Sequence, residues 1–238
     1  MAKLKFDATQ QYNDAREMPL FSIPLAAHYL QLPTTTLRSW VLGRNYQTGS
    51  GTKRFRPLIE IPTGPGKLLS FFNLAEAHVL SAFRREQEIP LPAIRSALNY
   101  VAKEFGSPHP LIDKDFETDG ASLFITKLGK LVDASAGGQL AMRQVLHEHL
   151  QRIEREKDIV ARLYPFTRLG FSGPRTVFID PRYSFGKPIL AGPRIPTGAI
   201  AERYRAGEST DDLAADYECT RLDIEEAIRC ELCLNAAA

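Results

Sequence analysis

The chain has 238 residues, 44% of them hydrophobic and 24% charged, and a formal net charge of +2. This composition is typical of a globular protein with one large or two medium domains and argues against a disordered chain. No apolar run is long enough to span a bilayer and no apolar signal core follows the first residues, so we expect a cytoplasmic protein with no membrane partner.

The small net charge conceals an asymmetry along the chain. Between residues 38 and 67 there are six basic side chains and one acidic side chain, whereas between residues 202 and 231 there are ten acidic and four basic ones. A polyanion is attracted to the first segment and repelled by the second. The two ends of the chain are therefore expected to bind different partners.

The first patterned stretch starts at Ser22 and ends at Gly43, and it predicts two short helices around a tight turn. Ser22 is suited to cap the first helix and Pro24 fits its first turn. Pro33 breaks this helix, and Thr34 can cap a second one that Gly43 ends. Two such helices form a helix-turn-helix.

The outward positions of the second helix carry short hydrogen-bonding side chains and one arginine. These side chains suit phosphate oxygens and base edges in a major groove better than a protein core. An ordinary helical hairpin with its polar face toward water is the alternative. The candidate DNA-binding residues on this helix are Thr34, Thr35, Thr36, Arg38 and Ser39.

A glycine-rich, basic segment follows, and it resembles a wing that can lie along DNA phosphates. Extended segments at 58–61 and 68–72 flank a Pro/Gly-rich turn at 62–66, which predicts a hairpin. The glycines do not form a nucleotide-binding loop, because no Gly-Lys-Ser/Thr follows them. The candidate DNA-binding cations of this region are Arg44, Lys53, Arg54 and Arg56.

Two further helices are predicted after the wing, one capped by Asn73 and reaching residue 86, the other at 92–105. They would cover the helix-turn-helix and complete a first domain at 19–106. A polar, unpatterned flexible arm, residues 1–18, would precede this domain.

Residues 107–179 predict a mixed region of strands and helix that could pair two subunits. A helix is expected from residue 137 to about 157. Short strands are expected at 116–120, 123–126, 130–133, 163–166 and 176–180.

No catalytic, metal or cofactor site is expected in this region. The carboxylates at Asp113, Asp115, Glu117 and Asp119 alternate, which could suggest acid–base or metal chemistry but is also typical of a solvated strand face. His147 and His149 are two residues apart on a predicted helix, so they point to different faces and cannot bind one metal. We interpret both as surface or edge residues and the protein as a non-enzyme.

Residues 180–238 predict an acidic helical domain. Thr197, Ser209 and Thr220 are each suited to cap a helix, and Gly207 can end the first one. The three helices form a helix-turn-helix-like unit, but its acidity favours a protein interface over DNA. The cysteines Cys219, Cys230 and Cys233 are interpreted as small apolar residues, because no second ligand pair accompanies Cys230-x-x-Cys233.

Two segments resemble known families. The helix-turn-helix, basic hairpin and following helices resemble the winged DNA-binding domain of the MerR type. The segment from Asp180 resembles the small helical domain of predicted VapB-type antitoxins, and Pro193 departs from that family, which more often has threonine there. The matching positions are Gly186, Pro188, Gly192, Arg194, Ile195, Pro196, Ala206, Gly207, Asp216 and Tyr217.

The resemblance implies a type II antitoxin that binds operator DNA as a homodimer, represses its own operon and neutralises a PIN-like ribonuclease toxin. The alternative is a MerR-like regulator that responds to a small ligand in the middle region and has no toxin partner. The predicted fold is α+β and mostly helical: an N-terminal winged helix-turn-helix, a mixed middle region and a C-terminal three-helix domain. The residues expected to bind the toxin or a second subunit are Gly186, Arg194, Glu208, Asp211 and Asp216.

Overall fold

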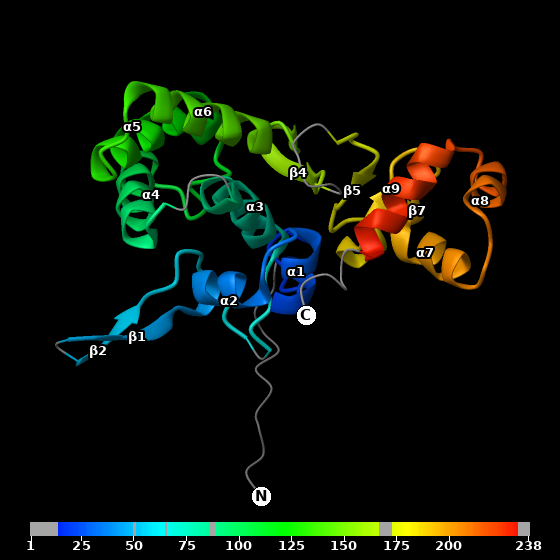
Figure 1. Cartoon of the computed structure of the whole chain (residues 1–238), viewed down its shortest axis with the longest axis horizontal. Coiled ribbons are helices and arrows are strands. Elements are labelled where there is room, and N and C mark those ends of the chain that lie inside the picture. The colour runs from blue at the N-terminus through cyan, green and yellow to red at the C-terminus, as the bar shows by residue number, and fades with distance from the viewer. Residues whose placement is uncertain (1–13, 50, 65, 86–88, 167–172, 233–238) are drawn as a thin grey trace, which may run out of the picture.

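The computed structural model describes residues 14–49, 51–64, 66–85, 89–166 and 173–232. Within these residues the chain is α+β and mostly helical, as the sequence predicts, with a helix-turn-helix at its N-terminal end. Figure 1 shows the first six helices on one side, the last three on the other, and one hairpin projecting away from both.

The helix-turn-helix consists of α1 (Ile23–Tyr29) and α2 (Thr34–Leu42). As predicted, the Ser22 side chain caps α1 by accepting a hydrogen bond from the Leu25 amide. The predicted cap at Thr34 is wrong, because Pro33 holds the N-cap position and Thr34 already lies in the helix. On its inner face α2 buries Leu37, Trp40 and Val41.

The wing is a hairpin of β1 (Arg44–Thr48) and β2 (Gly51–Phe55), and not the predicted hairpin across 58–72. Residues 58–61 form no strand, because the Leu58 and Ile59 amides both donate to the Trp40 carbonyl oxygen. Leu69 forms an isolated bridge with Phe21. The basic segment therefore forms both strands of the hairpin, without residues 58–72.

Two long helices, α3 (Phe71–Arg85) and α4 (Leu91–Phe105), follow the wing. The predicted cap at Asn73 is wrong, since Ser70 precedes the helix and caps it. The Ser70 hydroxyl accepts from the Asn73 amide, while the Asn73 side chain accepts from the Ser70 amide. This reciprocal arrangement is a capping box. Residues 71–83 are all buried, so α3 is the central helix of the fold.

The middle region is helical where three strands are predicted. A π-helical turn, η1 (Phe116–Gly120), leads into α5 (Ala121–Leu131), and α6 (Ala136–Leu150) packs beside α5. Phe116, Phe124 and Leu128 are buried together at helical spacing. Windows of four or five residues cannot distinguish this period from that of a strand.

The helix predicted through residue 157 ends at Leu150, and a hairpin of β3 (Ile153–Glu156) and β4 (Ile159–Leu163) follows. Lys157 and Asp158 both have positive φ, as the tight turn of this hairpin requires. The alternating carboxylates do not converge on a site: Glu117 pairs with Arg155.

The predicted arm is described from residue 14, and this part contacts the core. Arg16 pairs with Asp14, donates to the Val160 carbonyl and lies over the Phe72 ring. One hydrophobic core contains buried residues from Phe21 to Ile179, on both sides of the predicted domain boundary at 106/107. The division of the chain at that boundary stays a prediction.

The C-terminal part has its own buried cluster, from Val177 to Cys230. Ser209 and Thr220 cap helices as predicted, whereas the predicted cap Thr197 is the first helical residue after Pro196. Cys230 is buried, and Cys233 lies outside the described residues.

The helices and strands of the C-terminal part are β5 (Val177–Phe178), η2 (Ser184–Gly186), β6 (Ile189–Leu190), β7 (Ile195–Pro196), α7 (Thr197–Arg205), α8 (Thr210–Asp216) and α9 (Arg221–Leu232).

The junction between α2 and the wing generates a stability prediction. Gly43 has φ 73° and ψ 179°, and a Cβ added there would lie 2.3 Å from the Phe55 carbonyl oxygen. Gly43→Ala is expected to lower the free energy of unfolding by about 1–3 kcal/mol from backbone strain alone, measured by urea denaturation. Gly49→Ala is the control, because its Cβ would meet no atom within 4 Å. Equal stability of the two variants would contradict this role of Gly43.

Candidate nucleic-acid interface

The outer face of α2 is open to solvent. Thr34, Thr35 and Arg38 are exposed, while Thr36 and Ser39 are half-buried. The Ser39 hydroxyl donates to the Thr36 carbonyl oxygen at 2.8 Å, so its hydrogen is used within the helix and its lone pairs remain as acceptors. The helix thus presents short polar groups and one guanidinium to solvent, as the sequence predicts.

The register of the wing assigns its side chains to two faces. Successive residues of a strand alternate between faces, and directly paired residues share one. Arg44 pairs with Phe55 and Tyr46 with Lys53 on the first face, and Asn45 pairs with Arg54 on the opposite face. The predicted wing cations therefore do not form a single patch: Arg44 and Lys53 belong to one side, and Arg54 belongs to the other.

A cavity of about 420 Å³ joins α2 to the first face of the wing. Its walls include Thr35, Thr36 and Ser39 of α2 and Arg44 and Tyr46 of β1. We name it the recognition groove. Four of the predicted DNA-binding residues are thus brought together, and Arg38 lies on the exposed face of the same helix without lining the groove.

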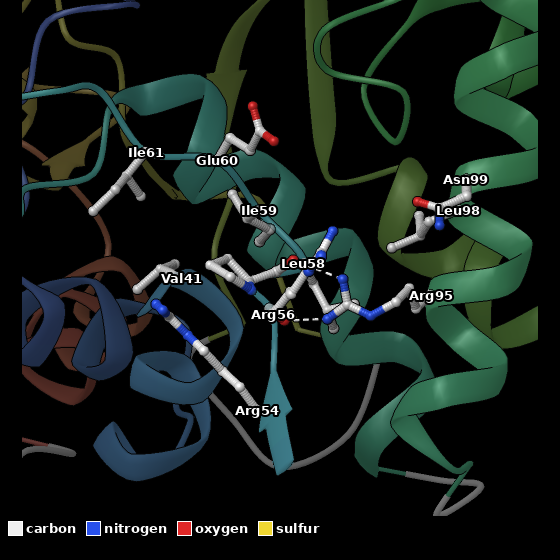
Figure 2. A pocket seen from close by; sticks show the side chains of 11 residues that line it. Val41, Arg54, Arg56, Leu58, Ile59, Glu60, Ile61, Arg95, Leu98 and Asn99 are labelled. Atoms are coloured by element: carbon white, nitrogen blue, oxygen red, sulfur yellow. Dashed lines mark hydrogen bonds between the residues drawn. The ribbon is translucent and has the colours of Figure 1, made fainter. Parts of the chain in front are cut away.

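A larger cavity of about 1030 Å³ lies between the wing root and α4, and we name it the arginine cleft. Figure 2 shows Arg54, Arg56 and Arg95 around it. Arg95 is not recognisable from the sequence, where it is a single cation in an amphipathic helix, because only the tertiary fold brings α4 beside the wing. The cleft is lined by Val41, Arg54, Arg56, Pro57, Leu58, Ile59, Glu60, Ile61, Arg95, Leu98 and Asn99.

Backbone and ring contacts fix Arg95 in place. Its guanidinium donates to the carbonyl oxygens of Arg56 and, at 2.9 Å, Pro57, and lies 4.5 Å from the centre of the Phe55 ring. Burial and the nearby charge of Arg56 lower the pKa of Arg95. The two guanidinium groups therefore repel each other across the cleft.

The residues predicted to bind a toxin or a second subunit have different environments. Gly186 is buried, and a Cβ there would lie 2.7 Å from the ring of Phe21, next to the start of α1. Arg203 pairs with both Glu208 and Asp216, so these two carboxylates are engaged within the chain. The other two predicted residues, Arg194 and Asp211, are exposed, and Asp211 forms a 3.5 Å ion pair with Arg221.

An exposed aromatic residue next to Gly186 is missed by the sequence prediction. Phe185 is 86% exposed and has φ 54°, and Ser184 before it also has positive φ. Such backbone conformations are costly for residues other than glycine. Exposure and strain together mark Phe185 as a candidate contact residue.

The two histidines of α6 differ. His147 is exposed as predicted. The surface prediction for His149 is wrong, because this residue is fully buried and its ring centre lies 5.0 Å from the ring centres of His78 and Phe166. In the described part of the chain, no three His, Cys, Asp or Glu residues gather as metal ligands. No helix in that part has both the length and the apolar character needed to cross a membrane.

Two domain families match the chain. The family described as "Putative DNA-binding HTH domain" matches residues 19–98, and that described as "Protein of unknown function (DUF433)" matches residues 177–229. The first match covers the helix-turn-helix and wing, and the second covers most of the C-terminal part.

Relatives that align along most of the chain are known from Mycobacterium tuberculosis H37Rv. "Putative antitoxin VapB45" is 30% identical over 230 residues, 89% of this chain and 93% of that protein. "Uncharacterized protein Rv2308" is 23% identical over 209 residues, 83% of each chain. The crystal structure of Rv2018 from M. tuberculosis aligns with a TM-score of 0.66 at 25% identity, over 89% of this chain and 98% of that one. The chain, with its N-terminal helix-turn-helix, thus belongs to the family of the mycobacterial protein named "Putative antitoxin VapB45".

Proposed function

We propose that this protein is the antitoxin of a type II toxin–antitoxin system: it binds operator DNA, represses its own operon and neutralises a PIN-like ribonuclease by direct contact. The observation that carries the proposal is the open polar face of α2 next to a cationic wing in a helix-turn-helix. The printed name of the relative that aligns along most of the chain supports the antitoxin role.

In this proposal α2 enters the major groove and the wing follows the phosphates, in the manner of a MerR-like winged domain. Thr34, Thr35 and Arg38 reach base edges or phosphates from the exposed face, with Thr36 and Ser39 beside them. The exposed cations of the wing contact the DNA backbone in this proposal. They are Arg44, Lys53, Arg54 and Arg56. Phosphate contacts give affinity and register, and the α2 side chains give sequence preference.

A homodimer is part of the proposal. One α2 helix reads only a short half-site, whereas two helices held about 34 Å apart read two half-sites one helical turn apart. Binding of such a dimer to its own operator represses the operon.

The C-terminal part is proposed to hold the toxin. Phe185 offers an apolar anchor in a segment whose neighbour Lys187 is also exposed. Exposed aromatic residues that become buried on binding commonly dominate the energy of protein interfaces. Arg194 and Asp211 are exposed candidates for polar contacts in this part.

The wing cations are tested by the triple variant Lys53→Ala, Arg54→Ala and Arg56→Ala. Its affinity for duplex DNA is expected to fall at every sequence, and the slope of log K against log salt to become shallower by about 0.9 per lost phosphate contact. Fluorescence anisotropy between 50 and 200 mM salt measures both quantities. Lys130→Ala, an exposed lysine on α5, is the control. An unchanged slope in the triple variant would refute the role of the wing.

The recognition helix is tested by its sequence preference. Thr35→Ala or Arg38→Ala is expected to change which operator is preferred, since each lost base contact costs about 1–3 kcal/mol of discrimination. Selection from a randomised duplex library measures this, and Thr63→Ala, an exposed threonine outside α2, serves as control. If both α2 variants select the same sequence as the control, α2 does not read the bases.

The toxin contact is tested by Phe185→Ser. Because this side chain is 86% exposed, the variant is expected to fold and to bind DNA normally, yet to fail to restore growth when co-expressed with the toxin. Leu131→Ser removes another exposed apolar side chain, at the end of α5, and should neutralise the toxin as the unmodified protein does. Full neutralisation by Phe185→Ser would place the contact elsewhere.

A further inference from the structure

The arginine cleft holds more positive charge than its own residues balance. Three arginines line it, and Glu60 is the acidic residue among its lining. Within the described residues neither Arg54 nor Arg56 forms an ion pair, and Arg95 donates to backbone carbonyls. Guanidinium groups without carboxylate partners favour an added anion, and their planar geometry matches a phosphate.

The arginine cleft and the recognition groove are lined by different cations of the wing. Lys53 shares a face with Tyr46, which lines the recognition groove, whereas Arg54 points to the opposite face and lines the arginine cleft. A wing lying flat on one DNA backbone would use the cations of one face only. Cations on both faces fit a wing that stands in a groove with a backbone on each side.

We propose that the arginine cleft binds the sugar–phosphate backbone of a second DNA strand, which makes Arg95 of α4 a nucleic-acid contact. This rests on the proposed DNA-binding function and extends it from one backbone to two. In this arrangement Arg54 and Arg56 would contact the phosphates from the wing and Arg95 from α4. Figure 2 shows these three side chains around the cleft. The cleft has a volume of about 1030 Å³, and Leu58 and Ile61 in its lining offer apolar surface for deoxyribose.

Arg95 is already ordered before DNA arrives. Two carbonyl oxygens and the Phe55 ring hold its guanidinium, so little side-chain entropy remains to be lost on binding. Burial and Arg56 lower the pKa of Arg95, a sign of repulsion that a bound phosphate would relieve.

Strand-specific cleavage tests the arrangement. Lys53→Cys, Arg54→Cys and Asn99→Cys are each labelled with an iron chelate that cuts DNA nearby, and the labelled unmodified protein, with its native cysteines, gives the background. The label at 53 is expected to cut one strand of the operator, and the labels at 54 and 99 the other. Cuts by 53 and 54 at the same positions of one strand, or no cuts from 99, would overturn the inference while leaving DNA binding intact.

The charge of Arg95 is tested separately. Arg95→Gln keeps hydrogen-bond donors for the two carbonyls and removes the charge, and Lys103→Gln removes an exposed cation from the same helix. The salt slope is expected to become shallower by about 0.9 for Arg95→Gln and to stay unchanged for Lys103→Gln. An unchanged slope in a folded Arg95→Gln protein would refute the contact. If the unmodified protein does not bind duplex DNA, this inference and the proposed function both fail.

Discussion

The position of the wing relative to α2 depends on Trp40. Its side chain is completely buried, which fixes the last turn of α2, and its carbonyl oxygen accepts from the amides of Leu58 and Ile59. The chain therefore leaves α2, forms the hairpin and returns to the same turn of the same helix. Gly43 permits this path, because a side chain there would meet the Phe55 carbonyl. In the proposed DNA complex, a rigid link of this kind would let one domain present a helix and a ribbon in a fixed geometry.

The C-terminal part contacts the helix-turn-helix at the start of α1, where Gly186 packs against Phe21. At the other end of α1, the Gln31 side chain donates to the carbonyl oxygen of Phe166, in the segment after β4. The ring of His28 is buried, and its pKa is lowered by that burial. The first helix of the helix-turn-helix is thus held at its start by the C-terminal part and at its end by the segment after β4. In the proposed antitoxin, a toxin bound near Phe185 would lie close to the start of α1.

Local patterns predict α1, α2 and the caps at Ser22, Ser209 and Thr220 correctly, because a cap and its apolar spacing involve residues within about one helical turn of each other. The wing register, the burial of His149 and the arginine cleft depend on contacts between distant segments. Arg95 and Arg56 are 39 residues apart in sequence, so no local pattern could join them. The prediction of strands within 116–133 is wrong for another reason. Short apolar runs fit the periodicity of a strand and of a helix equally well, and here the packing of α5 against α4 and α6 favours the helix.

Ion pairs engage part of the negative charge of the C-terminal surface. Arg203 pairs with Glu208 and Asp216. Arg229 pairs with Glu225 and with the buried Glu226. Each of these arginines faces two carboxylates, so each cluster keeps a net negative charge of about one. The segment therefore still repels DNA, as its composition indicates, and it also offers a partner protein exposed carboxylates such as Glu202 and Glu218. Recognition of a toxin there would combine these exposed carboxylates with an apolar anchor such as Phe185, whereas the unpaired arginines of the wing would make the proposed DNA binding depend mainly on charge.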